Sequence, residues 1–133
     1  MEETTLDMGL VTYPLGFGQL RFNPTDPNLY DRFLKGMEAL EGWKLPADVE
    51  PVEWLQKTDR ELKDILTQVF GQENDFDRIL GGVSLLALAG NGKYVLENLL
   101  LWLEPVLADG AKKCVEALTR QELAAAKTRR DAL

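Results

Sequence analysis

The chain contains no histidine and a single cysteine, Cys114, among its 133 residues. Without histidine, neither Ser-His or Cys-His nucleophile pairs nor imidazole metal ligands can form. A lone cysteine cannot close a disulfide within the chain, and it gives no sign of an oxidising compartment. No pair among the 22 acidic residues stands out as an acid–base couple. We therefore expect a non-enzymatic protein of the cytoplasm, with no catalytic residue, no cofactor and no metal site.

Two short segments match ligand-binding loops only in part. The turn Gly90-Asn91-Gly92-Lys93 has Ala87 and Tyr94 where a phosphate-binding loop needs a glycine and a serine or threonine. The acidic stretch at residues 73–77 has Leu80 where a calcium loop needs its glycine. We interpret the first as a helix–helix turn and the second as a helix start, so no small-molecule ligand is expected.

The net charge of −7 is unevenly distributed along the chain. Residues 1–78 carry 16 acidic and 8 basic side chains, whereas residues 79–133 carry 6 acidic and 7 basic ones. An acidic surface repels phosphate backbones, which disfavours nucleic acid as a partner. Residues 112–131 hold six basic and three acidic residues, so a basic helix there could meet an acidic partner or simply be solvated.

No membrane or secretory segment is expected. The opening residues lack the positive start and apolar stretch of a signal peptide. The most apolar region, residues 79–107, is interrupted by Lys93, Glu97, Glu104 and four glycines, so it is predicted to form core helices rather than a membrane span.

The pattern predicts a mostly helical α+β domain spanning residues 1–133. Its parts are a β-hairpin at residues 6–22, a compact bundle of about four to five helices whose core spans residues 26–110, and a C-terminal helix at residues 111–133. The hairpin strands are predicted at residues 10–13 and 19–22, joined by a five-residue loop over residues 14–18.

Helix boundaries follow from caps and breakers. A first helix should begin at Asp26-Pro27 and end near residues 41–42. A second should run from Pro51 to Gly71 with Lys63 on its polar side, and a third from Asn74 or Asp75 through Leu80.

The later part of the chain is also predicted to be helical. Residues 83–89 are almost all apolar, and because leucine and alanine outnumber β-branched residues there we favour a buried helix over a strand. A last helix should begin near Lys93 and be kinked or divided by Pro105.

Beyond Gly110 the apolar stripe thins to three large side chains, Val115, Leu118 and Leu123. This segment favours helix but lacks an apolar face wide enough to dock firmly on its own domain, so we expect it to be mobile or held by a partner. The candidate partner-binding residues are these three, Arg129 and Arg130 at its basic end, and Trp43 in a proline-bounded loop.

Three stretches together resemble the tail assembly chaperones, small proteins encoded in the tail modules of long-tailed phages and prophages of Gram-positive bacteria. They are Phe22-Asn23-Pro24-Thr25-Asp26-Pro27-Asn28-Leu29-Tyr30-Asp31-Arg32-Phe33, then Phe70-Gly71 with Asp77-Arg78-Ile79-Leu80-Gly81-Gly82, and Gly90-Asn91-Gly92-Lys93 with Glu97-Asn98-Leu99-Leu100. The likeness spans about residues 8–118. It implies a helper that coats the hydrophobic tape-measure protein before the tail tube polymerises, with that protein or another tail protein as partner and self-association open.

Two other classes of function remain open. A virion subunit, such as a tail-completion or head–tail connector protein, would use the hairpin as an edge strand for ring assembly. A small acidic regulatory protein, for example an inhibitor of a host enzyme, would use its negative surface as a mimic of nucleic acid. For that function, the negative charge of its front half would have to lie as one continuous stripe.

Overall fold

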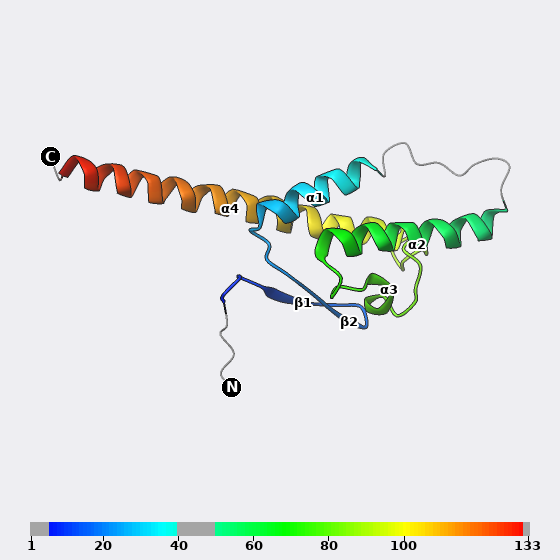
Figure 1. Ribbon diagram of the computed structural model, residues 1–133. Coiled ribbons are helices and arrows are strands. Elements are labelled where there is room, and N and C mark those ends of the chain that lie inside the picture. The colour runs from blue at the N-terminus through cyan, green and yellow to red at the C-terminus, as the bar shows by residue number, and fades with distance from the viewer. Residues whose placement is uncertain (1–5, 40–49, 132–133) are drawn as a thin grey trace, which may run out of the picture.

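The computed structural model of the chain describes residues 6–39 and 50–131. It is mostly helical, with an N-terminal two-stranded antiparallel hairpin followed by four helices, which confirms the predicted α+β class. The hairpin and the first three helices gather around the first part of α4 (Val95–Asp131), and the last part of α4 extends away from them (Figure 1).

The hairpin consists of β1 (Val11–Leu15) and β2 (Gly18–Phe22), which pair in the register Val11↔Phe22 to Leu15↔Gly18. Its connection has two residues, so the predicted five-residue loop is wrong. Gly16 has a φ of 55° and Phe17 has no positive φ, which is the pattern of a type II′ turn. Pro14 remains within β1, where its missing N–H is tolerated because it lies on an edge strand.

Helices α1 (Pro27–Glu38) and α2 (Pro51–Phe70) begin as the sequence predicts. The Asp26 side chain accepts a hydrogen bond of 2.9 Å from the backbone N–H of Asn28, and proline occupies the first turn of both helices. Helix α2 ends at Gly71, whose φ of 105° suits glycine. Helix α1 ends three residues earlier than predicted, at Glu38 with Ala39 as its C-cap.

Helix α3 (Phe76–Ile79) is short and is capped by Asp75 rather than Asn74. The prediction of a helix at residues 83–89 is wrong, because backbone groups there form hydrogen bonds with partners outside a helix. The Leu85 N–H donates to the Asp59 carboxylate at 2.8 Å, and the Val95 N–H donates to the Ala87 carbonyl at 2.9 Å. Residues 80–94 therefore form an ordered non-helical loop over α2.

Helix α4 begins at Val95, two residues after the predicted start, and continues for 37 residues. Pro105 lies inside it at an exposed position and does not divide it. Within the described residues, no helix is both long enough and apolar enough to cross a membrane.

The core forms where the hairpin, α1, α2 and α3 meet the first half of α4. Phe22 stacks on Tyr13 at 4.9 Å between ring centroids and meets Phe70 edge-on at 5.0 Å. Tyr13 in turn contacts Trp102 of α4 at 5.2 Å. The buried apolar side chains of α4 are Leu99, Leu103 and Leu107.

The prediction that Lys63 lies on the polar, exposed side of α2 is wrong. Lys63 is only 4% exposed, and its ammonium group lies 2.9 Å from Asp59 and 2.7 Å from Asp77. Since Asp77 belongs to α3 and Asp59 accepts from Leu85, this ionic group joins α2 to α3 and to the following loop. Its charges are paired within the fold, so we assign it a structural role.

Candidate protein-binding site

The part of α4 beyond Gly110 forms the candidate site. This outer segment, residues 111–131, is about 30 Å long at 1.5 Å per residue. Gly110 is the last buried residue of the helix, and every residue from 118 to 131 is exposed. Figure 1 shows the segment as a single rod that extends from the body of the protein without another described element beside its far end.

The body ends where α4 crosses the chain that precedes α1. A Cβ atom built on Gly110 would overlap the carbonyl oxygen of Pro24 and lie 3.1 Å from the backbone nitrogen of Thr25. Only glycine permits this approach between the two backbones. The contact therefore fixes the point and direction at which α4 leaves the core.

The structure places five of the six predicted site residues on this segment, but it does not gather the three apolar ones on one face. Val115, Leu118 and Leu123 are 64%, 57% and 65% exposed. At 100° per residue, Val115 and Leu118 lie about 60° apart, whereas Leu123 lies about 140° from Leu118. Leu123 therefore belongs to a different side of the helix from Leu118, and the expected single stripe is not present.

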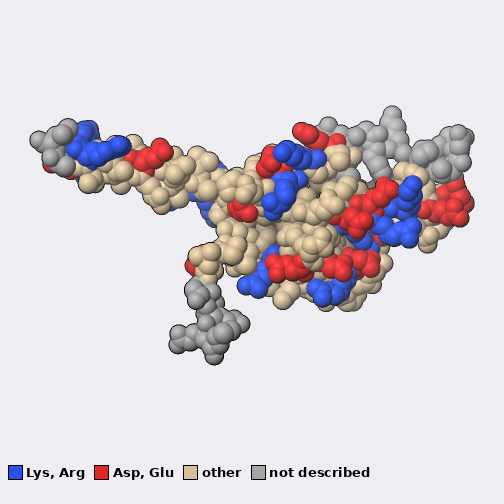
Figure 2. Space-filling model, viewed as in Figure 1, with Lys and Arg blue, Asp and Glu red and all other residues tan. Residues whose placement is uncertain are grey.

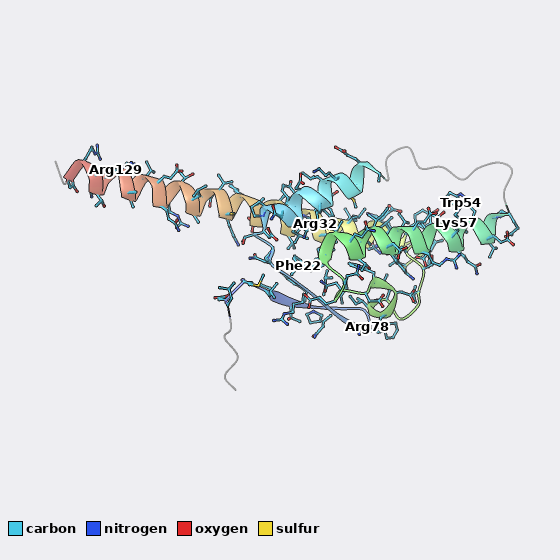
Figure 3. All side chains as sticks on the ribbon, in the orientation of Figure 1. Phe22, Arg32, Trp54, Lys57, Arg78 and Arg129 are labelled. Atoms are coloured by element: carbon cyan, nitrogen blue, oxygen red, sulfur yellow. The ribbon has the colours of Figure 1, made fainter. Side chains whose placement is uncertain are left out.

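The two predicted arginines lie at the far end of the same helix. Arg129 points away from the packed elements in Figure 3, and Arg130 is likewise exposed. Trp43 lies outside the described residues.

A second set of residues, which the pattern of large apolar side chains does not identify, shares one face with Leu118. It continues the stripe by which Leu103, Leu107 and Gly110 pack on the core, with the same alternation of three and four residues. We call this face the seam, and its members are Cys114, Ala117, Leu118, Gln121, Ala124 and Ala125. The three-and-four spacing of these residues is visible in the sequence, but most of them are small, so a pattern of large apolar side chains does not include them.

The seam opens onto a groove beside the body. A groove of about 700 Å³ lies between Thr25 and residues 113–121 of α4. It adjoins a second groove of about 500 Å³, since Thr25 and Cys114 line both. Apolar side chains of the second groove include Met8, Leu10 and Phe22, so apolar surface continues from the outer segment into the body.

Basic residues border one side of the seam. Lys113, Arg120 and Lys127 recur every seven residues, which places them in one row along the helix, here called the basic row. Lys113 pairs with Asp109 at 3.2 Å, with both side chains largely exposed. Within the described part of the chain, no acidic side chain forms an ion pair with Arg120 or Lys127.

The described residues include no group of three or more histidine, cysteine or acidic side chains that could hold a metal ion. The chain matches no protein family, no curated protein sequence and no solved structure. What the arrangement offers is an exposed helix with an apolar face and a flanking row of cations, which suits contact with another polypeptide.

Proposed function

We propose that this chain is a non-enzymatic protein-binding helper that acts in the bacterial cytoplasm during phage tail assembly. In this proposal the outer segment of α4 binds the tape-measure protein or another tail component, as the resemblance to tail assembly chaperones implies. The observation that carries the proposal is the apolar seam on a helix that extends beyond its own core.

Helix energetics support a partner for this segment. Most helical stability in proteins comes from packing an apolar face against other elements rather than from the helix propensity of the residues. The outer segment lacks such packing within the described chain, while Val115 and Leu118 remain exposed. A partner that covers the seam would supply the missing burial, at roughly 25 cal/mol per Å² of apolar surface.

The charge distribution also suits a soluble helper. Outside residues 112–131 the chain carries 9 basic and 19 acidic side chains, a net charge of −10. Such a body stays soluble while its basic arm is occupied by a partner. This division of roles matches the coating of a long apolar helical protein.

The hairpin is a poor edge for ring assembly, which weighs against the virion-subunit alternative. On β2, the side chain of Asn74 already pairs with both backbone groups of Arg21 at 2.9 Å. On β1, Pro14 lies opposite Gln19, a position whose backbone groups face outward in a hairpin with a two-residue turn. An incoming strand would therefore lack one donor on β1 and be blocked at Arg21 on β2.

The regulatory alternative requires a continuous acidic stripe. On the face shown in Figure 2, acidic and basic side chains alternate over α1, α2 and α3 instead of separating by sign. Asp31 with Lys35 is an example of this intermixing, since both side chains are exposed and their charged groups lie 2.9 Å apart. A surface of this kind is a poor mimic of a nucleic-acid backbone.

The test is co-purification of the full chain with the tape-measure protein encoded in the same genome. Mixed at micromolar concentrations, the two should co-elute in size-exclusion chromatography, and a chain ending at residue 110 should not. Failure of the full chain to co-elute, or recovery of the chain in purified virions, would contradict the proposal.

A further inference from the structure

The seam and the basic row together define the chemistry of the partner, and this inference rests on the proposed function. We propose that the outer segment of α4 docks an amphipathic helix that has bulky aliphatic residues on its apolar face and acidic residues along the flank that meets Lys113, Arg120 and Lys127.

The seam calls for a helix with large side chains. In heptad terms Cys114 and Gln121 occupy one core position, Ala117 and Ala124 the other, and Leu118 and Ala125 the position beside it. Five of these six residues are smaller than leucine or polar, so the seam is shallow and lets a partner backbone approach closely. Leucine or isoleucine from the partner would fill the space beside them.

The basic row calls for acidic residues on that partner. Its members flank the seam at the position that faces the partner helix in a two-helix packing. Arg120 and Lys127 have no ion-pair partner within the described residues, and Lys113 has only an exposed one. Carboxylates at seven-residue spacing would complement all three, whereas lysines would be repelled.

A second copy of this chain is disfavoured by the same row. In an antiparallel pair of α4 helices, the two basic rows would face each other. In a parallel pair, each row would face Ala111, Leu118 and Ala125, which offer no negative charge. The charge pattern therefore favours a different, acidic helix over self-association.

The groove beside Thr25 gives the docked helix a place to end. The seam leads from Gln121 past Cys114 to Thr25, where the adjoining groove exposes Met8 and Leu10. Apolar residues at the end of the partner helix can thus contact the body as well as the arm. This continuity extends the buried area beyond what one helix face would provide.

The experiment uses the full chain and two synthetic peptides of four heptads. Both peptides have leucine at their core positions, and their flanking positions carry glutamate in one and lysine in the other. Isothermal titration calorimetry should show at least about tenfold tighter binding of the glutamate peptide at about 50 mM salt, with the preference reduced at about 500 mM.

Two variant pairs locate the contact. The variant R120E/K127E should reverse the preference, while K112E/R129E, which changes the net charge equally on other faces, should retain it. Leu118→Gln should weaken binding of the glutamate peptide at least about fivefold, whereas Leu123→Gln on another side should change it less than about twofold. Circular dichroism should show all four variants folded, because the altered side chains are exposed.

The outcomes separate this inference from the proposed function. Equal binding of both peptides, or an unchanged preference in R120E/K127E, would overturn the inference. The inference would also be overturned if the chain alone sediments as a dimer and that dimer does not bind the glutamate peptide. If the chain binds the tape-measure protein through residues 111–131 and R120E/K127E binds it equally well, the proposed function stands and the acidic partner is rejected. If the glutamate peptide binds as expected and the tape-measure protein does not, only the proposed function fails.

Discussion

The side chain of Asn74 pairs with the backbone of Arg21 as a neighbouring strand would. Its Oδ1 accepts from the Arg21 N–H and its Nδ2 donates to the Arg21 carbonyl, both at 2.9 Å, and Nδ2 also donates to the Phe70 carbonyl at 2.8 Å. Asn74 thereby closes the outer edge of β2 and ties the hairpin to the end of α2. Asn74 is only 1% exposed, and these three hydrogen bonds explain why a polar side chain can be buried here.

Asn74→Ala should lower the free energy of unfolding by about 2 kcal/mol, because the Phe70 carbonyl is left buried without its donor. Urea unfolding followed by circular dichroism measures the loss. Asn28→Ala, at an exposed position in the first turn of α1, is the matched control and should change stability by less than about 0.5 kcal/mol. Equal effects of the two substitutions would contradict the role assigned to Asn74.

Gly110→Ala tests the close contact between α4 and the chain before α1. A methyl group there would overlap the Pro24 carbonyl oxygen, and a backbone atom cannot rotate away as a side chain can. Alanine favours helix by about 1 kcal/mol, but overpacking costs about 1–3 kcal/mol, so the net change should be destabilising. Thermal unfolding should show a lower Tm for Gly110→Ala than for Gly90→Ala, since a Cβ on Gly90 has no neighbour within 4 Å. A raised Tm in Gly110→Ala would show that α4 does not pack on Pro24.

Lys63→Met should be strongly destabilising, by about 3 kcal/mol, because it leaves the buried Asp59 carboxylate unpaired. Methionine keeps much of the side-chain volume, so the loss reports on charge more than on packing. The double variant D59N/K63M should regain part of that stability, because the asparagine oxygen can still accept from Leu85. A double variant no more stable than Lys63→Met would contradict this account.

The pH dependence follows from the same group. Burial lowers the pKa of the Lys63 ammonium, but its hydrogen bonds to Asp77 and Asp59 and the attraction of their negative charges together raise it by more, so the pKa in the folded chain lies above 10.5. The ion pairs therefore contribute fully below pH 10.5 and are lost as the pH rises through the folded-state pKa. Unfolding measured from pH 9 upward should show the stability difference between the native chain and Lys63→Met constant up to about pH 10.5 and shrinking above it. A difference that stays constant at higher pH would contradict the shift.

Pro105→Ala should raise the free energy of unfolding. Pro105 lies at an exposed position within a continuous helix, where it lacks the N–H that would donate to the Leu101 carbonyl. Proline costs up to about 3 kcal/mol relative to alanine inside a helix, and relief of part of that cost outweighs the small change in exposed surface. Chemical denaturation measures the gain, with Glu104→Ala as a control at the neighbouring exposed position. No gain would mean that the helix is already adjusted around the proline.

The sequence predicts local features of this fold well and long-range ones poorly. Asp26, Pro27, Pro51 and Gly71 mark helix ends through their own backbone chemistry, so their positions are correct. Residues 83–89 are apolar enough for a helix, but Asp59, 26 positions away from Leu85, bonds to that backbone and holds a loop instead. Lys63 was misplaced for the same reason, since its partner Asp77 belongs to another helix.

The candidate site was predicted in part for a related reason. Val115, Leu118 and Leu123 are exposed, which agrees with the thinning of the apolar stripe beyond Gly110. These three residues do not share one face, because the five-residue step from Leu118 to Leu123 turns Leu123 about 140° around the helix. The three-and-four spacing of small residues from Cys114 onward carried the better signal, which large-residue counting overlooks.

The protection of backbone amides against hydrogen exchange should differ between the two parts of α4 on either side of Gly110. Amides of residues 99–110 pack on the core through Leu99, Leu103 and Leu107, so their protection should approach the global stability of the chain. Amides of residues 115–131 lie on an exposed helix and should exchange at nearly the rate of a fraying peptide. Mass spectrometry of the exchanging chain, alone and with the glutamate-flanked peptide, should show new protection confined mainly to residues 111–128 and the Thr25 region. Strong protection of residues 115–131 in the chain at micromolar concentration would instead mean that the seam is already covered by a second copy, because no described part of the same chain lies over it.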